Sequence, residues 1–165
     1  MAQPHRHDRL SWDECLMQMA WLIGQRSSDP STQAGACIAN EKNVVIGLGY
    51  NGWPRGIDND ALPWEREGDF LTTKYAYVVH GEENAIYNAS TDVAGCKLYC
   101  TLYPCNECAK TIIQSGINEV IYMSDKYHDH QSWVASRKLF ELAGIKTRQY
   151  IPQFKINLEN NDGQI

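Results

Sequence analysis

The chain contains no long apolar run and has no excess of positive charge. No apolar stretch approaches the roughly 20 residues that a membrane-spanning helix needs, which argues against a membrane protein. The N-terminal segment MAQPHRHDRL is polar and has no apolar stretch of the signal-peptide type, so we expect a cytoplasmic protein. The 15 basic and 20 acidic residues give a formal net charge of −5, whereas proteins that bind nucleic-acid polymers usually carry a basic surface. The charge therefore disfavours a long polyanionic partner but is compatible with a small anionic ligand.

Internal repeats, low-complexity tracts and linker-like segments are also lacking. With 165 residues, of which 43% are hydrophobic, the chain has the size and composition of one globular domain. We assign one domain to residues 1–165, with a core over about 11–152 and a polar, loosely attached tail from Pro152 onward.

The first predicted element is a helix over residues 11–26. Ser11 and Glu14 form a capping-box pattern at its start, and the turn cluster SSDPST follows its end. At helical spacing, the side chains expected to face the core are Trp12, Leu16, Met19 and Ile23.

The remaining pattern predicts a mixed sheet. A β-hairpin is predicted over residues 34–50 and is followed by a long loop rich in Gly, Pro and Asp. The length of this loop indicates a functional segment. Strands and helices then alternate: helix 80–90, strand 97–102, helix 104–116, strand 118–123, helix 131–144 and strand 145–151. Because such alternation implies parallel pairing and the hairpin adds antiparallel pairing, we predict a three-layer α/β/α fold with about five strands.

One histidine and two cysteines match the ligand set of a catalytic zinc site. Close cysteine spacing in a chain without export signals points to metal binding or catalysis rather than to disulfides. Catalytic zinc usually has three protein ligands and one open position, and His80, Cys105 and Cys108 supply such a set. Both ligand segments are expected at helix N-termini, where the helix dipole favours thiolates.

Glu82 distinguishes a catalytic site from a structural one. It is too close in sequence to His80 to be a convincing fourth ligand, but a carboxylate beside an activated water can accept and redeliver its proton. The pattern H-x-E followed by P-C-x-x-C is the signature of zinc deaminases. The alternative is a closed structural zinc with Cys96 or Cys100 as fourth ligand, which leaves Glu82 without a role.

The sequence is similar to the deoxycytidylate (dCMP) deaminases of the cytidine deaminase superfamily. The segments that carry this resemblance, in family order, are RSSDPSTQAGACIAN, GYNGWPRG, HGEENAI, PCNECAKTIIQSGI and MSDKYHD. The resemblance implies a zinc-dependent enzyme that converts dCMP and water to dUMP and ammonia, feeding thymidylate synthesis. Zinc held by His80, Cys105 and Cys108 would activate a water that attacks C4 of cytosine, with Glu82 as proton carrier. The motif has Gly81 where the family usually has Ala.

The resemblance also implies substrate contacts. The residues assigned to them are Asn51, Arg26, Tyr127, Gly81 and Lys126. Asn51 matches the position that contacts the sugar, or is a turn residue before Gly52. Arg26 could bind the 5′-phosphate, or only favour a helix C-terminus. For Lys126 the alternative is a solvated loop.

Members of this family are commonly homohexamers that dCTP activates and dTTP inhibits. The loop after Gly49 resembles the effector region, where Asp58, Asn59 and Asp60 could hold the effector's sugar or a Mg²⁺ ion, or be ordinary solvated loop residues. The segment before His80 has no Cys or His, so we predict one zinc ion per chain. Other readings remain open: a deaminase of dCTP, a nucleoside or tRNA, or a regulatory protein that keeps the fold without turnover.

Overall fold

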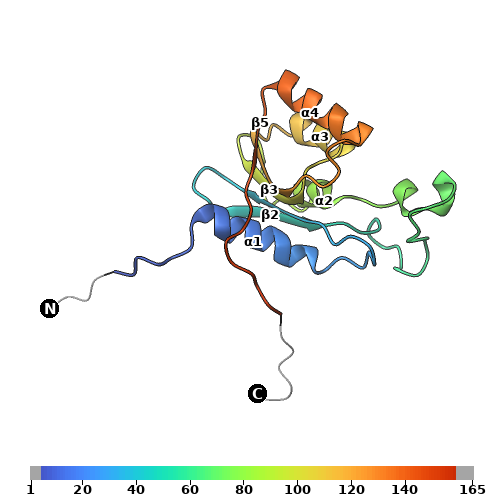
Figure 1. The fold of residues 1–165 in the computed structure, drawn as a ribbon, viewed down its shortest axis with the longest axis horizontal. Helices are drawn as coiled ribbons and strands as arrows, with labels where there is room; N and C mark the ends of the chain where they lie inside the picture. Colours follow the sequence, from blue (N-terminus) through green and yellow to red (C-terminus); the bar gives the residue numbers. More distant parts are fainter. Residues whose placement is uncertain (1–4, 159–165) are drawn as a thin grey trace, which may run out of the picture.

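A mixed five-stranded sheet forms the centre of the structure, a computed structural model that describes residues 5–158 (Figure 1). The strand order is β2-β1-β3-β4-β5. β1 pairs antiparallel with both β2 and β3, whereas β3, β4 and β5 run parallel. The strand bounds are β1 Gly35–Ala39, β2 Val45–Tyr50, β3 Lys97–Leu102, β4 Glu119–Ser124 and β5 Lys146–Gln149.

Helices cover both faces of the sheet (Figure 1). α1 (Trp12–Gly24) lies on one face, and α2 (Gly81–Tyr87), α3 (Asn106–Gln114) and α4 (Gln131–Ala143) lie on the other. Between β2 and α2, the chain forms a protruding segment with two short 3₁₀ turns, Phe70–Thr72 and Lys74–Ala76. The predicted three-layer α/β/α arrangement is confirmed.

The inner strand β1, between β2 and β3, is buried along its whole length because both of its faces are covered. Ala36 and Ile38 belong to the core under α2, α3 and α4, whereas Cys37 and Ala39 pack toward α1. This explains why the strand is a continuous apolar run rather than an alternating one.

The predicted buried face of α1 was confirmed at Leu16 but wrong at Trp12 and Met19. Trp12 is 57% exposed and Met19 is 37% exposed, whereas Leu16, Met17 and Ala20 are fully buried. Apolar residues occur on nearly every side of this helix, so their periodicity does not determine which side faces the sheet.

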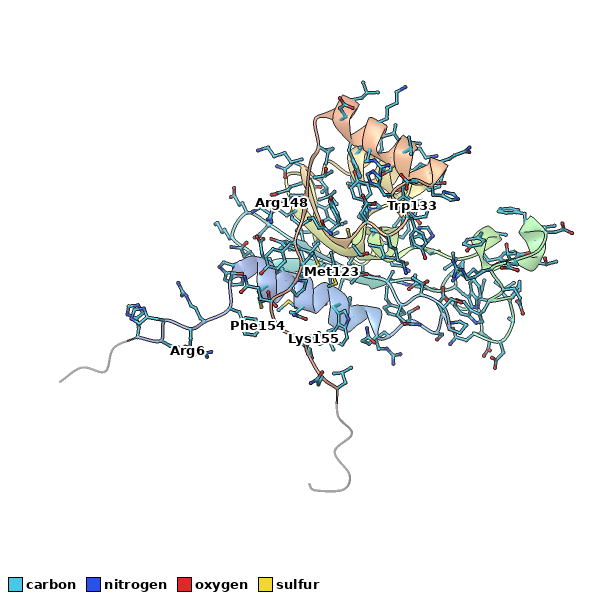
Figure 2. The ribbon with its side chains drawn as sticks, in the orientation of Figure 1. Arg6, Met123, Trp133, Arg148, Phe154 and Lys155 are labelled. Atoms are coloured by element: carbon cyan, nitrogen blue, oxygen red, sulfur yellow. The ribbon has the colours of Figure 1, made fainter. Side chains whose placement is uncertain are left out.

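A loose tail was expected from Pro152 onward, but its described part is attached to α1, and residues 159–165 lie outside the described residues. Tyr150 donates its hydroxyl hydrogen bond to Glu14 Oε2 at 2.8 Å, and the Gln153 and Phe154 amides donate to the same carboxylate. Figure 2 shows the segment crossing α1 at Phe154. Within residues 5–158, no helix combines the length and apolar character that membrane crossing requires.

Candidate active site

His80 and Cys105 each lie immediately before the first residue of a helix. His80 is the N-cap of α2, and its backbone N–H lies 3.5 Å from Glu83 Oε2 in a capping box. Cys105 is the N-cap of α3 and follows Pro104 after β3. Cys108 lies in the first turn of α3 and is fully buried. The two helix starts thereby place all three side chains together, as their positions in the sequence predict.

These three side chains form a candidate metal centre. Their ligand atoms lie within 4.8 Å of one another, with His80 Nδ1 3.2 Å from Cys108 Sγ and 3.4 Å from Cys105 Sγ. All six cysteines are free, and among residues 5–158 no other His, Cys, Asp or Glu joins the set. One imidazole and two thiols with no fourth protein ligand fit a catalytic zinc ion.

The electrostatics of this cluster favour a thiolate. The hydrogen bond from Cys108 and the contact with His80 outweigh burial and lower the pKa of Cys105 to about 4. Burial lowers the pKa of His80, but the Cys105 hydrogen bond and the Glu82 charge raise it to about 9. A cationic imidazole therefore faces an anionic Cys105 sulfur. The Cys105 hydrogen bond and burial raise the pKa of Cys108 well above its ordinary value, so the Cys108 thiol and the imidazole must lose their protons to bind a metal, whereas Cys105 is already a thiolate.

Glu82 lies beside the cluster but outside the ligand set. Its side chain is 7% exposed, and its Oε2 is 3.7 Å from Cys108 Sγ. Burial raises the pKa of Glu82 to about 7. A carboxyl group with this pKa can take up and release a proton near neutral pH.

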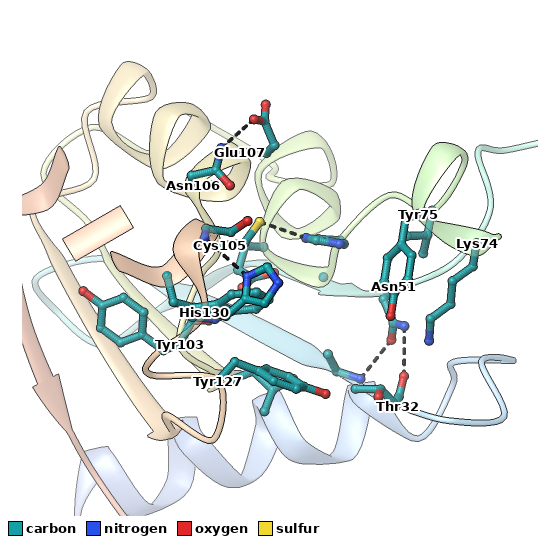
Figure 3. Close-up of a pocket in the computed structure, with 18 of the residues that line it drawn as sticks. Thr32, Asn51, Lys74, Tyr75, Tyr103, Cys105, Asn106, Glu107, Tyr127 and His130 are labelled. Carbon is teal, nitrogen blue, oxygen red and sulfur yellow. Dashed lines mark hydrogen bonds between the residues drawn. The ribbon is translucent and has the colours of Figure 1, made fainter. Parts of the chain in front are cut away.

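The cluster opens into a cavity of about 550 Å³ that His80, Glu82 and Cys105 help to line (Figure 3). Figure 3 shows Thr32, Asn51, Lys74 and Tyr75 along one wall and Tyr103, Tyr127 and His130 along the other. Trp133 also lines the cavity and packs against Tyr127 and His130. A cavity of this size, with a few convergent polar groups, is typical of a small-molecule site.

Asn51 is buried in the cavity wall with its side chain held by the protein. Its Oδ1 accepts from the Ala34 amide at 2.8 Å, and its Nδ2 donates to Thr32 O at 2.9 Å and to Asp29 Oδ2 at 3.2 Å. Both amide hydrogens are therefore used within the protein, and one lone pair of Oδ1 remains for a ligand.

The other substrate residues expected from the sequence fall into two groups. Gly81 and Tyr127 line the cavity. Arg26 is exposed in the turn after α1 and is not part of the cavity wall. Lys126 is also outside the wall, and its Nζ lies 4.9 Å from the centre of the Tyr127 ring.

The three residues expected to bind an effector are exposed in the loop after β2. Asp58 Oδ1 accepts from the Asp60 amide, and the Asn59 carbonyl accepts from both Trp53 and Trp64 indoles. The two indole rings stack at 3.8 Å between centroids. These contacts stabilise the loop itself.

Two features of the cavity wall were missed from the sequence. Lys74 and Asp29 form a buried ion pair, with Nζ 2.5 Å from Oδ2, and Arg66 lines the same cavity. Lys74 and Asp29 are 45 residues apart, so no local motif connects them. The turn-forming Asp in DPST and the polar Thr-Lys-Tyr segment before His80 are the available signals.

Comparison with known proteins defines the class first. The model of the cytidine and deoxycytidylate deaminase zinc-binding region matches residues 10–124, which include all three candidate ligands. A solved structure of the dCMP deaminase of cyanophage S-TIM5, in complex with dCMP and dUMP, superposes with a TM-score of 0.70 over 87% of this chain and 100% of that one. At 24% sequence identity, this superposition shows a shared fold alone.

Relatives with higher sequence identity show to which family within this class the chain belongs. Human deoxycytidylate deaminase is 55% identical over 150 residues, covering 90% of this chain and 84% of the human protein. The probable deoxycytidylate deaminase of Drosophila melanogaster is 44% identical over 162 residues, covering 92% and 80%. The chain belongs to the deoxycytidylate deaminase family and is a hydrolase.

Proposed function

We propose that this protein catalyses the hydrolytic deamination of dCMP to dUMP and ammonia, using one zinc ion held by His80, Cys105 and Cys108. The observation that carries the proposal is a three-ligand cluster that opens into a cavity beside the buried Glu82 carboxylate. The high identity to deoxycytidylate deaminases supports dCMP as the substrate.

The roles of the residues follow from their places in the cavity. Zinc supplies the Lewis acidity that makes water a nucleophile near neutral pH. As water adds to C4 of cytosine, Glu82 accepts its first proton and transfers that proton to N3. Glu82 then takes the second proton from the new C4 hydroxyl and delivers it to the amine, so that the C4–N bond breaks, ammonia leaves and the C4 carbonyl of dUMP forms. The Gly81 backbone N–H at the start of α2 contributes to the polar surroundings of the reacting carbon, in the manner of other preorganised sites. Asn51 offers its remaining Oδ1 lone pair to a sugar hydroxyl, and Tyr127 contacts the nucleotide from the opposite wall.

Glu82→Gln tests the proton-transfer role. The amide keeps the size of the side chain but cannot accept the proton, so ammonia release should fall by about 100- to 10,000-fold. Zinc content, measured by mass spectrometry or a chelator assay, should remain that of the wild type because Glu82 is not a ligand. Unchanged turnover in this variant would contradict the role.

A substrate panel tests the substrate class. Purified protein should deaminate dCMP with a higher kcat/KM than CMP, deoxycytidine or dCTP. A preference for dCTP or deoxycytidine would replace dCMP as the substrate. Deamination of tRNA would point to an adenosine deaminase instead, although the net charge of −5 disfavours that polymer. Zinc-loaded protein that turns over none of them would favour the regulatory reading.

We also propose that the protein works in the cytoplasm as a single-domain homohexamer, activated by dCTP and inhibited by dTTP. The support is the resemblance of the loop around Asp58, Asn59 and Asp60 to the family's effector region, where a Mg²⁺ ion could accompany the triphosphate. Adding dCTP or dTTP to the dCMP assay, with and without Mg²⁺, tests the regulation, and sedimentation tests the assembly.

A further inference from the structure

Three buried side chains in the cavity lining, Asp29, Asn51 and Lys74, form a connected polar network. They are 3%, 5% and 5% exposed. Lys74 Nζ lies 2.5 Å from Asp29 Oδ2, and Asn51 Nδ2 donates to the same oxygen at 3.2 Å. The ion pair compensates both charges inside the protein, where either charge alone would be strongly destabilising. Neither Asp29 nor Lys74 has a role in the proposed reaction, so the pair needs another explanation.

The Asp29 carboxylate holds the Asn51 side chain in two ways. Directly, its Oδ2 accepts one of the two amide hydrogens of Asn51. Its Oδ1 accepts from the backbone amides of Ser31 at 2.8 Å and Thr32 at 3.2 Å, which orders the turn after α1. The Thr32 carbonyl of this turn accepts the other Asn51 amide hydrogen at 2.9 Å (Figure 3). Loss of the carboxylate would therefore weaken both hydrogen bonds of Asn51 Nδ2.

These contacts select one of the two orientations of the Asn51 amide. Nδ2 faces two acceptors, and Oδ1 faces a donor, the Ala34 amide, at 2.8 Å. If the two ends of the amide were exchanged, Oδ1 would face the Asp29 carboxylate and the Thr32 carbonyl, and Nδ2 would face the Ala34 N–H. Each of these groups would then lose its partner, which is costly in a buried site. The orientation with oxygen available to a ligand is therefore the one that the network stabilises.

We infer that Asp29, paired with Lys74, is a positioning residue that fixes Asn51 as the hydrogen-bond acceptor for the 3′-hydroxyl of the substrate. This inference rests on the proposed function. A 2′-deoxynucleoside 5′-monophosphate has one free sugar hydroxyl, at the 3′ position, so this is the sugar group that can donate to Asn51 Oδ1. In the exchanged orientation, Asn51 would present a donor to the same place and would no longer select for that hydroxyl as a donor.

The experiment compares dCMP with 2′,3′-dideoxycytidine 5′-monophosphate, which lacks only the 3′-hydroxyl. Wild type should prefer dCMP in kcat/KM by about 10-fold, because the dideoxy compound cannot donate to Asn51 Oδ1. In Asp29→Asn, the new amide either presents N–H groups to Asn51 Nδ2 or gives up the turn amides, so the preference should fall to about 2-fold or less. The loss should lie in the value for dCMP. Both compounds have the same base and phosphate, so effects on those parts cancel in the ratio.

Two further variants separate positioning from stability. Lys74→Met leaves the Asp29 carboxylate buried without its partner and should lower the melting temperature. Combining Lys74→Met with Asp29→Asn removes both charges, so the melting temperature should recover toward that of wild type, whereas the preference for dCMP should stay as low as in Asp29→Asn. Asp69→Asn is the matched control and should behave as wild type, because Asp69 is exposed in the protruding segment and its side chain caps no helix.

Three results would overturn the inference: an equal loss for both compounds in Asp29→Asn, an unchanged preference in that variant, or a preference restored in the double variant. Calorimetric binding of the two compounds in a Glu82→Gln background makes the same comparison without turnover. A wild type that binds dCMP more tightly than the dideoxy compound but deaminates neither would refute the proposed function and leave this inference standing. A wild type that deaminates both equally well would refute this inference and leave the deamination of dCMP intact.

Discussion

At the scale of single residues, the Glu14 carboxylate in α1 binds the C-terminal segment through hydrogen bonds. Glu14 is 2% exposed and accepts hydrogen bonds from Gln18, Tyr150, Gln153 and Phe154. Burial opposes its charge, but these hydrogen bonds outweigh burial and hold the pKa of Glu14 below its ordinary value. The carboxylate is therefore charged in the folded protein over a wider pH range than in the unfolded chain.

Replacing Glu14 with Gln should lower the free energy of unfolding at pH 7 by about 1 to 3 kcal/mol, because an amide group presents donors to the donors of the tail. Because the pKa of Glu14 is lower in the folded protein than in the unfolded chain, its charge stabilises the folded state fully at pH values above the unfolded pKa of about 4.3. This stabilisation is lost as the pH falls through the folded-state pKa. The difference between wild type and Glu14→Gln should thus shrink below about pH 4.3. Urea unfolding across this range measures it, with Glu41→Gln, exposed in the β1–β2 turn, as control. A pH-independent difference would contradict the charge argument.

The meeting of single residues was predictable where a short motif contains all of them. The spacing of His80, Cys105 and Cys108 was sufficient, because two helix starts bring the ligands together. The presence of Arg66 in the cavity lining was not predictable this way. Arg26 is adjacent to polar turn residues in sequence, whereas Arg66 reaches the cavity only through the folding of a long loop.

At the scale of elements, glycines in β2 allow α2 to lie directly on the sheet. A Cβ atom at Gly49 would lie 2.1 Å from the Ala85 amide nitrogen and 2.3 Å from the Gly81 carbonyl oxygen. These are backbone atoms of the helix that carries Glu82 and follows His80. The close approach therefore sets the position of both groups relative to α3.

Gly49→Ala should displace α2 from the sheet. Overpacking of this kind costs about 1 to 3 kcal/mol, and the shift of His80 should reduce zinc content along with stability. Denaturant unfolding and metal analysis measure the two effects. Gly52→Ala is the control, because a Cβ there meets only the Tyr50 ring at 3.9 Å and should leave both properties near wild type. Normal zinc content in Gly49→Ala would show that α2 does not depend on this contact.

The type of each secondary-structure element was predictable, but the side of a helix that faces the core was not. The strand and helix alternation identified β3, α3, β4, α4 and β5, and glycines at positive φ end α3 and α4 as expected. The helix α1 was predicted correctly and Leu16 is buried as expected, but Trp12 and Met19, which are apolar and were expected in the core, are exposed. Its buried polar residues, Glu14 and Gln18, contact a tail that is about 136 residues further along the chain, and no local pattern reports such a partner.

At the scale of the whole molecule, the candidate metal centre joins α2 and α3, which begin after separate strands of one sheet. Each helix packs on the sheet through its own apolar residues, so the fold should survive without zinc. The ligands, however, come from segments that an unfolded chain does not hold together, and a metal that binds only the folded state adds its binding free energy to stability.

Removal of zinc should therefore lower the melting temperature without abolishing the cooperative transition. Zinc at a thousandfold excess over its Kd contributes about 4 kcal/mol, which for a chain of this length corresponds to a shift of about 10 °C. Circular dichroism of chelator-treated and zinc-reconstituted protein measures the shift, and the reconstituted form should contain one zinc ion per chain. Cys105→Ser removes a ligand while leaving the sheet intact, so chelator should barely change its melting temperature. An equal chelator shift in that variant would place the stabilising metal elsewhere, and an unfolded apoprotein would show that the sheet and its helices depend on zinc to fold.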